Sequence, residues 1–178
     1  MTDWNLLDFS RMEEGRREYR FEPLEPAPWL HGLVEDFQSK LLGNHVSIVA
    51  TIPDALPALV ADREALTCAV HNLLDNAIKY APGSDNVWLE AEGDDSRLTI
   101  RVRDRGIGIL EADRKHLFEK FYRGSGDITQ QVKGAGLGLS LVQHIVRAHG
   151  GEVEFESHPG DGTTFSIHLK AAAPEPGA

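Results

Sequence analysis

The sequence predicts a two-layer α/β sandwich of the α+β type, with about three main helices on one face of a five-stranded sheet. Segments with helical hydrophobic spacing occur together with short segments that are β-branched or alternate apolar and polar residues. Most neighbouring strand candidates are joined by turns rather than by helices, which is the pattern of hairpins. Because hairpin strands are antiparallel, we expect a mixed, mostly antiparallel sheet with its helices on one face.

The expected elements follow one another over residues 29–170, which we interpret as the folded domain. Glycine or proline follows each main helix, and Asp62 is the expected N-cap of the second one. Turn residues such as Asp94-Asp95-Ser96 separate the paired strands. In order, we predict a helix at 29–42, strands at 46–52 and 59–60, a helix at 62–80, strands at 87–93 and 98–103, a short helix at 111–118, a helix at 137–149, and strands at 152–157 and 163–169.

The two ends of the chain differ in composition from this domain. Residues 1–20 begin with helix formers and are expected to be the end of a separate helix with the start of a linker. Three prolines make residues 21–28 the predicted linker, because each proline removes a backbone donor and disfavours helix before it. Residues 171–178 are expected to be a disordered tail.

Composition excludes several classes of function. The net charge of −10 argues against a nucleic-acid partner, which would need a basic face. No apolar run reaches the roughly 18 residues that span a bilayer, so we expect no membrane contact by this chain. The single cysteine, Cys68, rules out an internal disulfide and is expected to be a small apolar residue on a helix.

The helix predicted at 62–80 carries two stripes of side chains. Leu66, Val70, Leu73 and Ala77 form the apolar stripe, and Asn72, Asn76 and Lys79 form a second, polar stripe to one side of it. An asparagine oxygen suits Mg²⁺, and a lysine can meet phosphate as a point charge. A solvated polar face is the alternative interpretation of this helix alone.

Two glycine-rich blocks follow. Asp104 ends a strand before Gly106, Gly108 and Ile109, so its carboxylate can accept from a donor such as the adenine amine, beside an apolar wall. An ordinary β-turn is the alternative there. The block 134–139 opens a helix, whose N-terminal amides suit phosphate. It is neither a dinucleotide fingerprint, since no apolar strand precedes it, nor a P-loop, since Gly-Lys-Ser/Thr is missing.

An aromatic block lies between these two. Phe118 and Phe121 are three residues apart and precede Arg123, at the start of the polar segment 123–136. The functional interpretation makes the aromatic pair the anchor of a mobile lid over a nucleotide. The alternative is a pair of core aromatics, which we expect for Phe118 in either case.

Taken in this order, the four blocks resemble the catalytic ATP-binding domain of sensor histidine kinases, the Bergerat fold. That superfamily includes DNA gyrase, mismatch-repair ATPases and a chaperone ATPase. Residues 72–80 are similar to the family's N box, 104–108 to its G1 box, 118–121 to its F box and 134–138 to its G2 box. The likeness covers residues 24–170, and Ala135 is a small departure from the usual threonine.

The resemblance implies ATP and Mg²⁺ as cofactors. It assigns Mg²⁺ to Asn76, with Asn72 as a possible second ligand, and makes residues 123–136 an ATP lid. The implied nucleotide-binding residues, in chain order, are Asn72, Asn76, Lys79, Tyr80, Asp104, Gly106, Gly108, Ile109, Phe118, Phe121, Arg123, Gly134, Gly136, Leu137, Gly138 and Leu139. Of these, Asn72, Asn76 and Lys79 are also the expected catalytic residues.

A comparison within the superfamily predicts transfer rather than hydrolysis. Hydrolysing relatives carry a glutamate base where this chain has Asn72, which cannot take a proton. In histidine kinases the acceptor is a histidine on a dimerising hairpin, and none of the eight histidines here has that context. Residues 6–15 resemble the last turns of that hairpin's second helix, so we expect a fragment of a longer kinase that does not autophosphorylate in cis.

The resemblance also implies the partners. They are ATP and ADP, the dimerisation domain of the parent kinase, and the receiver domain of a response regulator. It places the domain in the cytoplasm, in a parent protein anchored in the membrane. Two alternatives stay open from the sequence: an anti-sigma-factor serine kinase of the same superfamily, and a non-catalytic ATP-binding switch.

Overall fold

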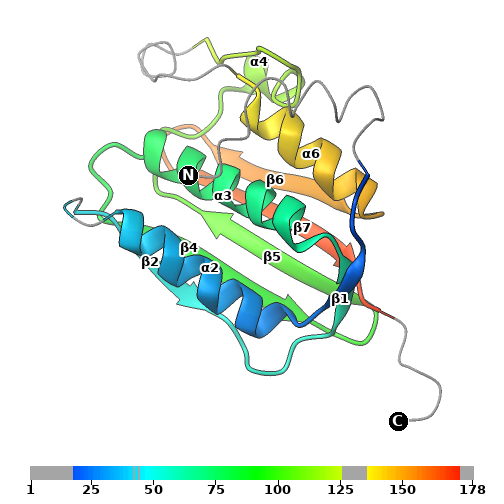
Figure 1. Ribbon diagram of the computed structural model, residues 1–178. Coiled ribbons are helices and arrows are strands. Elements are labelled where there is room, and N and C mark those ends of the chain that lie inside the picture. Colours follow the sequence, from blue (N-terminus) through cyan, green and yellow to red (C-terminus); the bar gives the residue numbers. More distant parts are fainter. Residues whose placement is uncertain (1–17, 42, 44, 126–135, 173–178) are drawn as a thin grey trace, which may run out of the picture.

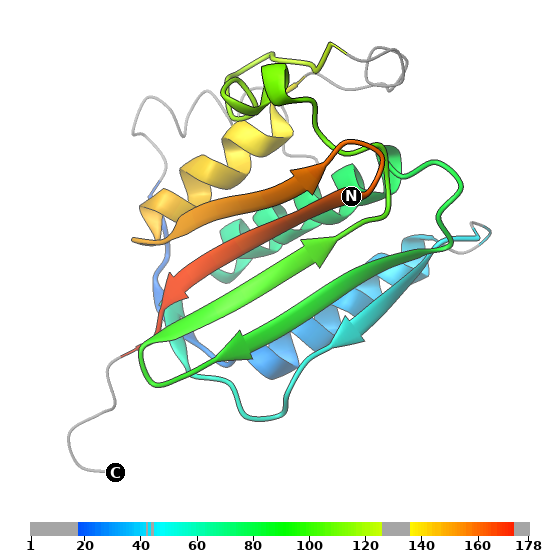
Figure 2. The same ribbon diagram turned by 180° about the vertical axis from the view of Figure 1, so that it is seen from behind.

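The computed structural model describes residues 18–41, 43, 45–125 and 136–172. Within these ranges the chain forms two layers (Figure 1), and its elements are β1 (Glu22–Leu24), α2 (Pro26–Lys40), β2 (Ser47–Thr51), β3 (Leu59–Ala61), α3 (Arg63–Lys79), β4 (Asn86–Gly93), β5 (Arg97–Arg103), α4 (Glu111–Arg114), α6 (Gly138–Ala148), β6 (Glu152–His158) and β7 (Gly162–Lys170). The predicted fold class is confirmed. Among the described residues, three long helices cover one face of a five-stranded sheet, and none of these helices lies on the opposite face (Figure 2).

The main sheet has the strand order β2-β4-β5-β7-β6. Only the β2–β4 pairing is parallel, and the other three pairings are antiparallel, as the turn-linked strands predicted. The strand predicted at 59–60 lies outside this sheet, because β3 pairs antiparallel with β1 in a small sheet of two strands.

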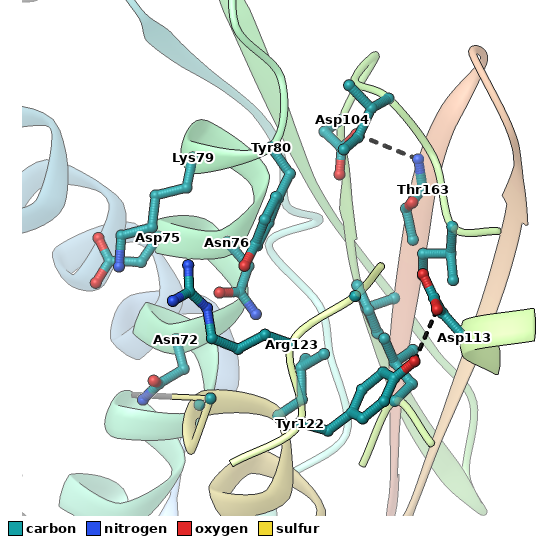
Figure 3. Close-up of a pocket in the computed structure, with 18 of the residues that line it drawn as sticks. Asn72, Asp75, Asn76, Lys79, Tyr80, Asp104, Asp113, Tyr122, Arg123 and Thr163 are labelled. Atoms are coloured by element: carbon teal, nitrogen blue, oxygen red, sulfur yellow. Dashed lines mark hydrogen bonds between the residues drawn. The ribbon is translucent and has the colours of Figure 1, made fainter. Parts of the chain in front are cut away.

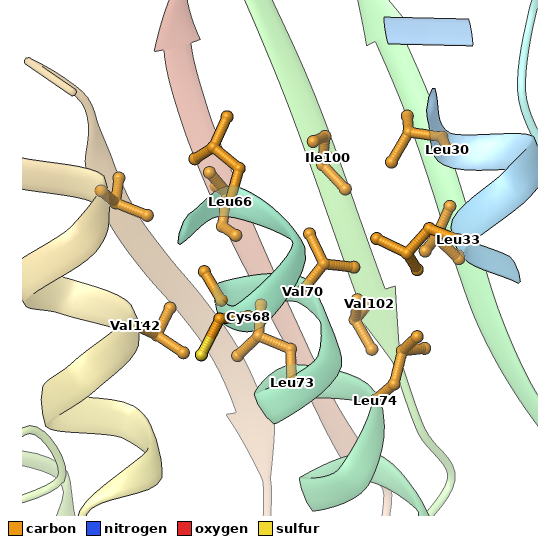
Figure 4. Packing of buried hydrophobic residues seen from close by; sticks show 14 of the residues in the cluster. Leu30, Leu33, Leu66, Cys68, Val70, Leu73, Leu74, Ile100, Val102 and Val142 are labelled. Carbon is orange, nitrogen blue, oxygen red and sulfur yellow. The ribbon is translucent and has the colours of Figure 1, made fainter. Parts of the chain in front are cut away.

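The core lies between the helices and the covered face of the main sheet. Leu66, Val70 and Leu73 of α3 are at most 1 % exposed, which confirms the predicted apolar stripe. Figure 4 shows these side chains between α6 and the strand β5, with Leu30 and Leu33 of α2 completing the layer. Cys68 is buried in the same cluster, as expected for a small apolar residue. This packing fixes α3, the helix that also carries the predicted asparagines.

The linker prediction assumed that residues 21–28 are irregular, but most of them form regular secondary structure. Glu22–Leu24 form β1, and Pro26 and Pro28 lie in the first turn of α2, which therefore begins three residues before the predicted start at Trp29. Proline fits there because the first amides of a helix have no intrahelical partner to lose. The predicted division at residue 29 stays a prediction. Most of the helix and tail expected at the two ends, residues 1–17 and 173–178, falls outside the described ranges. The first two residues of the expected tail are ordered against the domain, since the amides of Ala171 and Ala172 donate to the carbonyls of Ser96 and Ala58 at 3.0 and 2.7 Å.

Two further boundaries matter for the site. Asp62 caps α3 as predicted, since its Oδ1 accepts from the Ala65 amide at 3.0 Å. The short helix expected at 111–118 ends at Arg114, and hydrogen-bonded turns continue from there to Phe121. In the described ranges, every helix is too short or too polar to cross a membrane.

Candidate functional site

A cavity of about 490 Å³ opens where α3, α6 and the segment after β5 meet. Its volume lies in the range of small-molecule sites. Figure 3 shows side chains from these elements facing one another across it. The predicted site residues that line it are Asn72, Asn76, Lys79, Tyr80, Asp104, Gly108, Ile109, Phe121, Arg123, Gly136, Leu137, Gly138 and Leu139. Gly106 and Phe118 do not line it, and Gly134 lies outside the described residues.

On one side, two asparagine oxygens converge on the start of α6. A Cβ placed on Gly138 would lie 3.0 Å from Oδ1 of Asn72 and 4.0 Å from Oδ1 of Asn76. The Asn72 amide group is held by a hydrogen bond from its Nδ2 to the Cys68 carbonyl at 2.8 Å. Since α6 begins without a side-chain cap, its first amides are offered to the same space. Neutral oxygen ligands and helix amides are thus side by side.

At the other side, Asp104 follows β5 and is only 7 % exposed. Its Oδ1 accepts from the amides of Gly106 at 2.8 Å and Thr163 at 3.2 Å. Burial raises the pKa of the Asp104 carboxyl, although these two hydrogen bonds act in the opposite direction. No group among the described residues donates to Oδ2, so this carboxylate retains an unused acceptor beside the cavity.

The two glycines after Asp104 let this loop pack closely against the neighbouring backbone. They were predicted to allow close contact with a ligand, and the contacts that they make in the structure are with the protein itself. A Cβ on Gly106 would lie 2.1 Å from the Tyr80 carbonyl oxygen, and one on Gly108, where φ is +69°, would lie 2.1 Å from that of His158. The Ile107 amide donates to the Tyr80 carbonyl at 3.0 Å. Gly106 therefore shapes the site from behind by joining the loop to the end of α3.

The expected aromatic pair is not packed as a pair. Phe118 meets Phe155 edge-on with ring centroids 6.1 Å apart, which confirms the core alternative for this residue. Phe121 is 63 % exposed and adopts a positive φ of 59°. Its amide donates to the Gly136 carbonyl at 3.0 Å, so the last residue of the segment predicted as a lid is joined to the chain just before that segment. Residues 126–135 of that segment lie outside the described ranges.

Sequence reasoning missed several lining residues, including Asp75, Asp113, Tyr122, Thr163 and Phe165. Thr163 reaches Asp104 across 59 residues because the turn before β7 packs on the loop after β5. The available signal was Gly162, where a Cβ would lie 2.2 Å from the Asp104 carbonyl oxygen. Asp113 is one of two acidic residues on the short helix α4, and no pattern in the sequence distinguishes it from Glu111.

The donor set fits a magnesium ion that is bound largely through a ligand. Mg²⁺ takes few protein ligands and prefers phosphate oxygens and water. Among the described residues, no three His, Cys, Asp or Glu side chains gather into a metal site. The oxygens of Asn72 and Asn76 lie beside the amides of α6. This arrangement suits a magnesium ion that is held by few protein ligands and mainly by phosphate oxygens and water, rather than one that is enclosed by protein side chains.

We compared the chain with known protein families. Residues 61–173 match the family described as histidine kinase-, DNA gyrase B- and HSP90-like ATPases. The chain belongs to this family. Its relatives include the sensor histidine kinase WalK of Bacillus subtilis (strain 168), 29 % identical over 93 % of this chain and 27 % of WalK. The adaptive-response sensory kinase SasA of Synechococcus sp. (strain JA-2-3B'a(2-13)) is 37 % identical over 77 % of this chain and 36 % of SasA.

Solved structures agree with the sequence relatives. Full-length ShkA in complex with AMPPNP superposes with a TM-score of 0.78 at 27 % identity, over 94 % of this chain and 35 % of that one. The mycobacterial sensor histidine kinase MprB gives a TM-score of 0.68 at 25 % identity, over 85 % of this chain and 97 % of that one. The predicted resemblance to the catalytic ATP-binding domain of sensor histidine kinases is therefore confirmed. The chain spans about a third of the length of these curated relatives.

Proposed function

We propose that the cavity binds ATP with Mg²⁺ and that the domain donates the γ-phosphoryl group to a histidine on a separate dimerisation domain. The acceptor would pass the phosphate to an aspartate of a response-regulator receiver domain. One observation carries the proposal. A single cavity combines a buried carboxylate with an unused acceptor at one side and two asparagine oxygens beside helix amides at the other.

The Asp104 side of the cavity suits an adenine base. Asp104 would accept from the exocyclic amine through the oxygen that has no donor among the described residues. Tyr80 and Ile109 line the same cavity and would pack near the base or ribose. Guanine carries a carbonyl oxygen where adenine carries the amine, so the same carboxylate would reject it.

The other side suits the triphosphate. Asn76 would hold the metal with Asn72 close to it, and Lys79 and Arg123 line the cavity as cations for the phosphates. The amides at Gly136, Leu137 and Gly138 would bind phosphate oxygens at the start of α6. When bound, Mg²⁺ supplies charge neutralisation on the phosphates. The role implied for Gly134 stays a prediction.

The residues present favour transfer over hydrolysis. Asn72 occupies the position of the general base, has no proton affinity to serve as one, and its Nδ2 is engaged with Cys68. Phosphoryl transfer otherwise depends on positioning and charge stabilisation, which the remaining site residues can provide to an external nucleophile. This separates the proposal from an efficient ATPase of the same family.

Labelled ATP tests the proposal. The domain is incubated with γ-labelled ATP and Mg²⁺, alone and with the separately expressed dimerisation domain of its parent protein. We expect slow hydrolysis and no label on this chain alone, and an acid-labile, base-stable phosphohistidine on the added domain. Rapid hydrolysis, or a base-labile phosphoserine on a protein substrate, would contradict the proposed transfer. ATP binding without any transfer would favour a switch instead.

A further inference from the structure

Asp113 on α4 lies outside the four sequence blocks, yet it is among the most buried charged side chains of the described residues, at 5 % exposure. Its Oδ1 accepts from the Tyr122 hydroxyl at 2.7 Å and from the Ser125 hydroxyl at 2.9 Å. Its Oδ2 accepts from the Ser125 amide at 3.1 Å. Both oxygens are thus used, and all three donors come from the four residues that follow Phe121.

These hydrogen bonds hold the chain on both sides of Arg123. Tyr122 precedes it and Ser125 follows it by two residues, so a single carboxylate fixes the backbone that carries the arginine. Figure 3 shows the Asp113–Tyr122 bond at one side of the cavity and the Arg123 guanidinium extending the other way, toward Asn76 on α3. Arg123 is therefore aimed across the cavity from a tethered backbone.

The residue before this segment is held in an unfavourable conformation. Phe121 has a φ of +59°, a region that bulky L-residues rarely adopt. Such conformations persist only where the surroundings impose them. Here the Phe121 amide donates to Gly136 at 3.0 Å, and a Cβ on Gly136 would lie 2.8 Å from the Tyr122 carbonyl oxygen. The backbone is thus constrained from the Gly136 side as well as by Asp113.

We propose that Asp113 is a positioning residue, which directs the Arg123 guanidinium to the phosphate side of the cavity through its hydrogen bonds to Tyr122 and Ser125. The inference rests on the proposed binding of ATP. Asp113 itself makes no contact with the nucleotide in this proposal, because both of its oxygens are bonded to Tyr122 and Ser125. Its effect on binding therefore depends on Arg123 and on the presence of the distal phosphates.

The test is a double-mutant cycle measured by calorimetry with AMP-PNP and Mg²⁺, and with AMP. We expect Asp113→Ala to weaken AMP-PNP binding about tenfold, which corresponds to about 1.4 kcal/mol, and to leave AMP binding within twofold. Arg123→Ala should give a similar loss, and the double variant should lose little more than Arg123→Ala alone. Glu111→Ala, an exposed acid on the same helix, is the matched control and should bind as wild type.

Tyr122→Phe provides a second variant that removes one donor without emptying a buried site. It should weaken AMP-PNP binding by a smaller factor in the wild-type background and not at all in the Arg123→Ala background. Equal losses for AMP and AMP-PNP, or full additivity of Asp113→Ala with Arg123→Ala, would overturn the inference. If wild type itself does not bind AMP-PNP, the proposed function fails; if wild type binds and Asp113→Ala has no effect, only this inference fails.

Discussion

Two buried carboxylates line the same cavity, and they are used differently. Asp104 is 7 % exposed and Asp113 is 5 % exposed. Asp104 accepts two backbone amides on one oxygen and leaves the other without a donor among the described residues. Asp113 accepts three donors and uses both oxygens. Burial alone does not distinguish a carboxylate that can bind a ligand from one that holds the protein backbone. An oxygen that still lacks a donor, as in Asp104, does distinguish the two.

The pKa shifts of the two carboxyl groups follow from this difference. Burial is the largest influence at both sites and raises the pKa. At Asp104 the bonds from Gly106 and Thr163 do not offset it, and the pKa stays above its usual value. At Asp113 the bonds from Tyr122 and Ser125 outweigh it, and the pKa falls below its usual value. The ionised form is thus destabilised by the fold at one site and stabilised at the other.

Replacing Asp104 by Asn should remove its recognition of the nucleotide base, which is the largest effect that we expect. The amides of Gly106 and Thr163 require an acceptor, so the new amide oxygen stays with them and the NH₂ group faces the cavity. A donor would then meet the adenine amine, at a cost of about 3 kcal/mol or roughly 100-fold in affinity. Calorimetry with AMP-PNP measures this loss.

The same variant should keep its fold. Because the folded-state pKa of Asp104 is raised, ionisation at neutral pH disfavours the native state, and removing the charge removes that penalty. Urea unfolding at pH 7 should therefore give an unchanged or higher free energy of unfolding for Asp104→Asn. Near-normal nucleotide affinity in the folded variant would contradict the assignment of Asp104.

Replacing Asp113 by Asn should lower the free energy of unfolding, whereas Asp104→Asn should leave it unchanged or raise it. The change should be smaller than the loss of binding free energy in Asp104→Asn. The new NH₂ group meets the Ser125 amide, so one hydrogen bond is lost and two donors face each other. We expect a loss of about 1–2 kcal/mol in the free energy of unfolding at pH 7. Urea unfolding of both proteins measures it.

The difference in the free energy of unfolding between wild type and Asp113→Asn should depend on pH. The folded-state pKa of Asp113 lies below its unfolded value, so its ionised form contributes stability above the unfolded pKa and loses it as pH falls through the folded pKa. The wild-type advantage over Asp113→Asn should therefore shrink in acid, below about pH 4. A difference that stays constant from pH 7 to pH 3 would show that the charge of Asp113 contributes nothing.

The sequence was sufficient wherever the site depends on spacing within one element. Asn72, Asn76 and Lys79 share a helix face by their periodicity, and the structure places them together on the cavity wall. It was insufficient where packing between distant segments decides. The support of Asp104 by Thr163 and the close approach of Gly106 to Tyr80 depend on how loops meet in three dimensions. The prolines before residue 29 misled for a local reason, because the first turn of a helix accepts them.

One titration shows whether this cavity binds an adenine nucleotide together with Mg²⁺. AMP-PNP is titrated calorimetrically into the wild-type domain with and without Mg²⁺, and into Asn76→Ala under both conditions. We expect micromolar to sub-millimolar binding by wild type that Mg²⁺ strengthens, and binding by Asn76→Ala that no longer responds to the metal. Absence of binding by well-folded wild type, or a full response to Mg²⁺ in Asn76→Ala, would contradict this expectation.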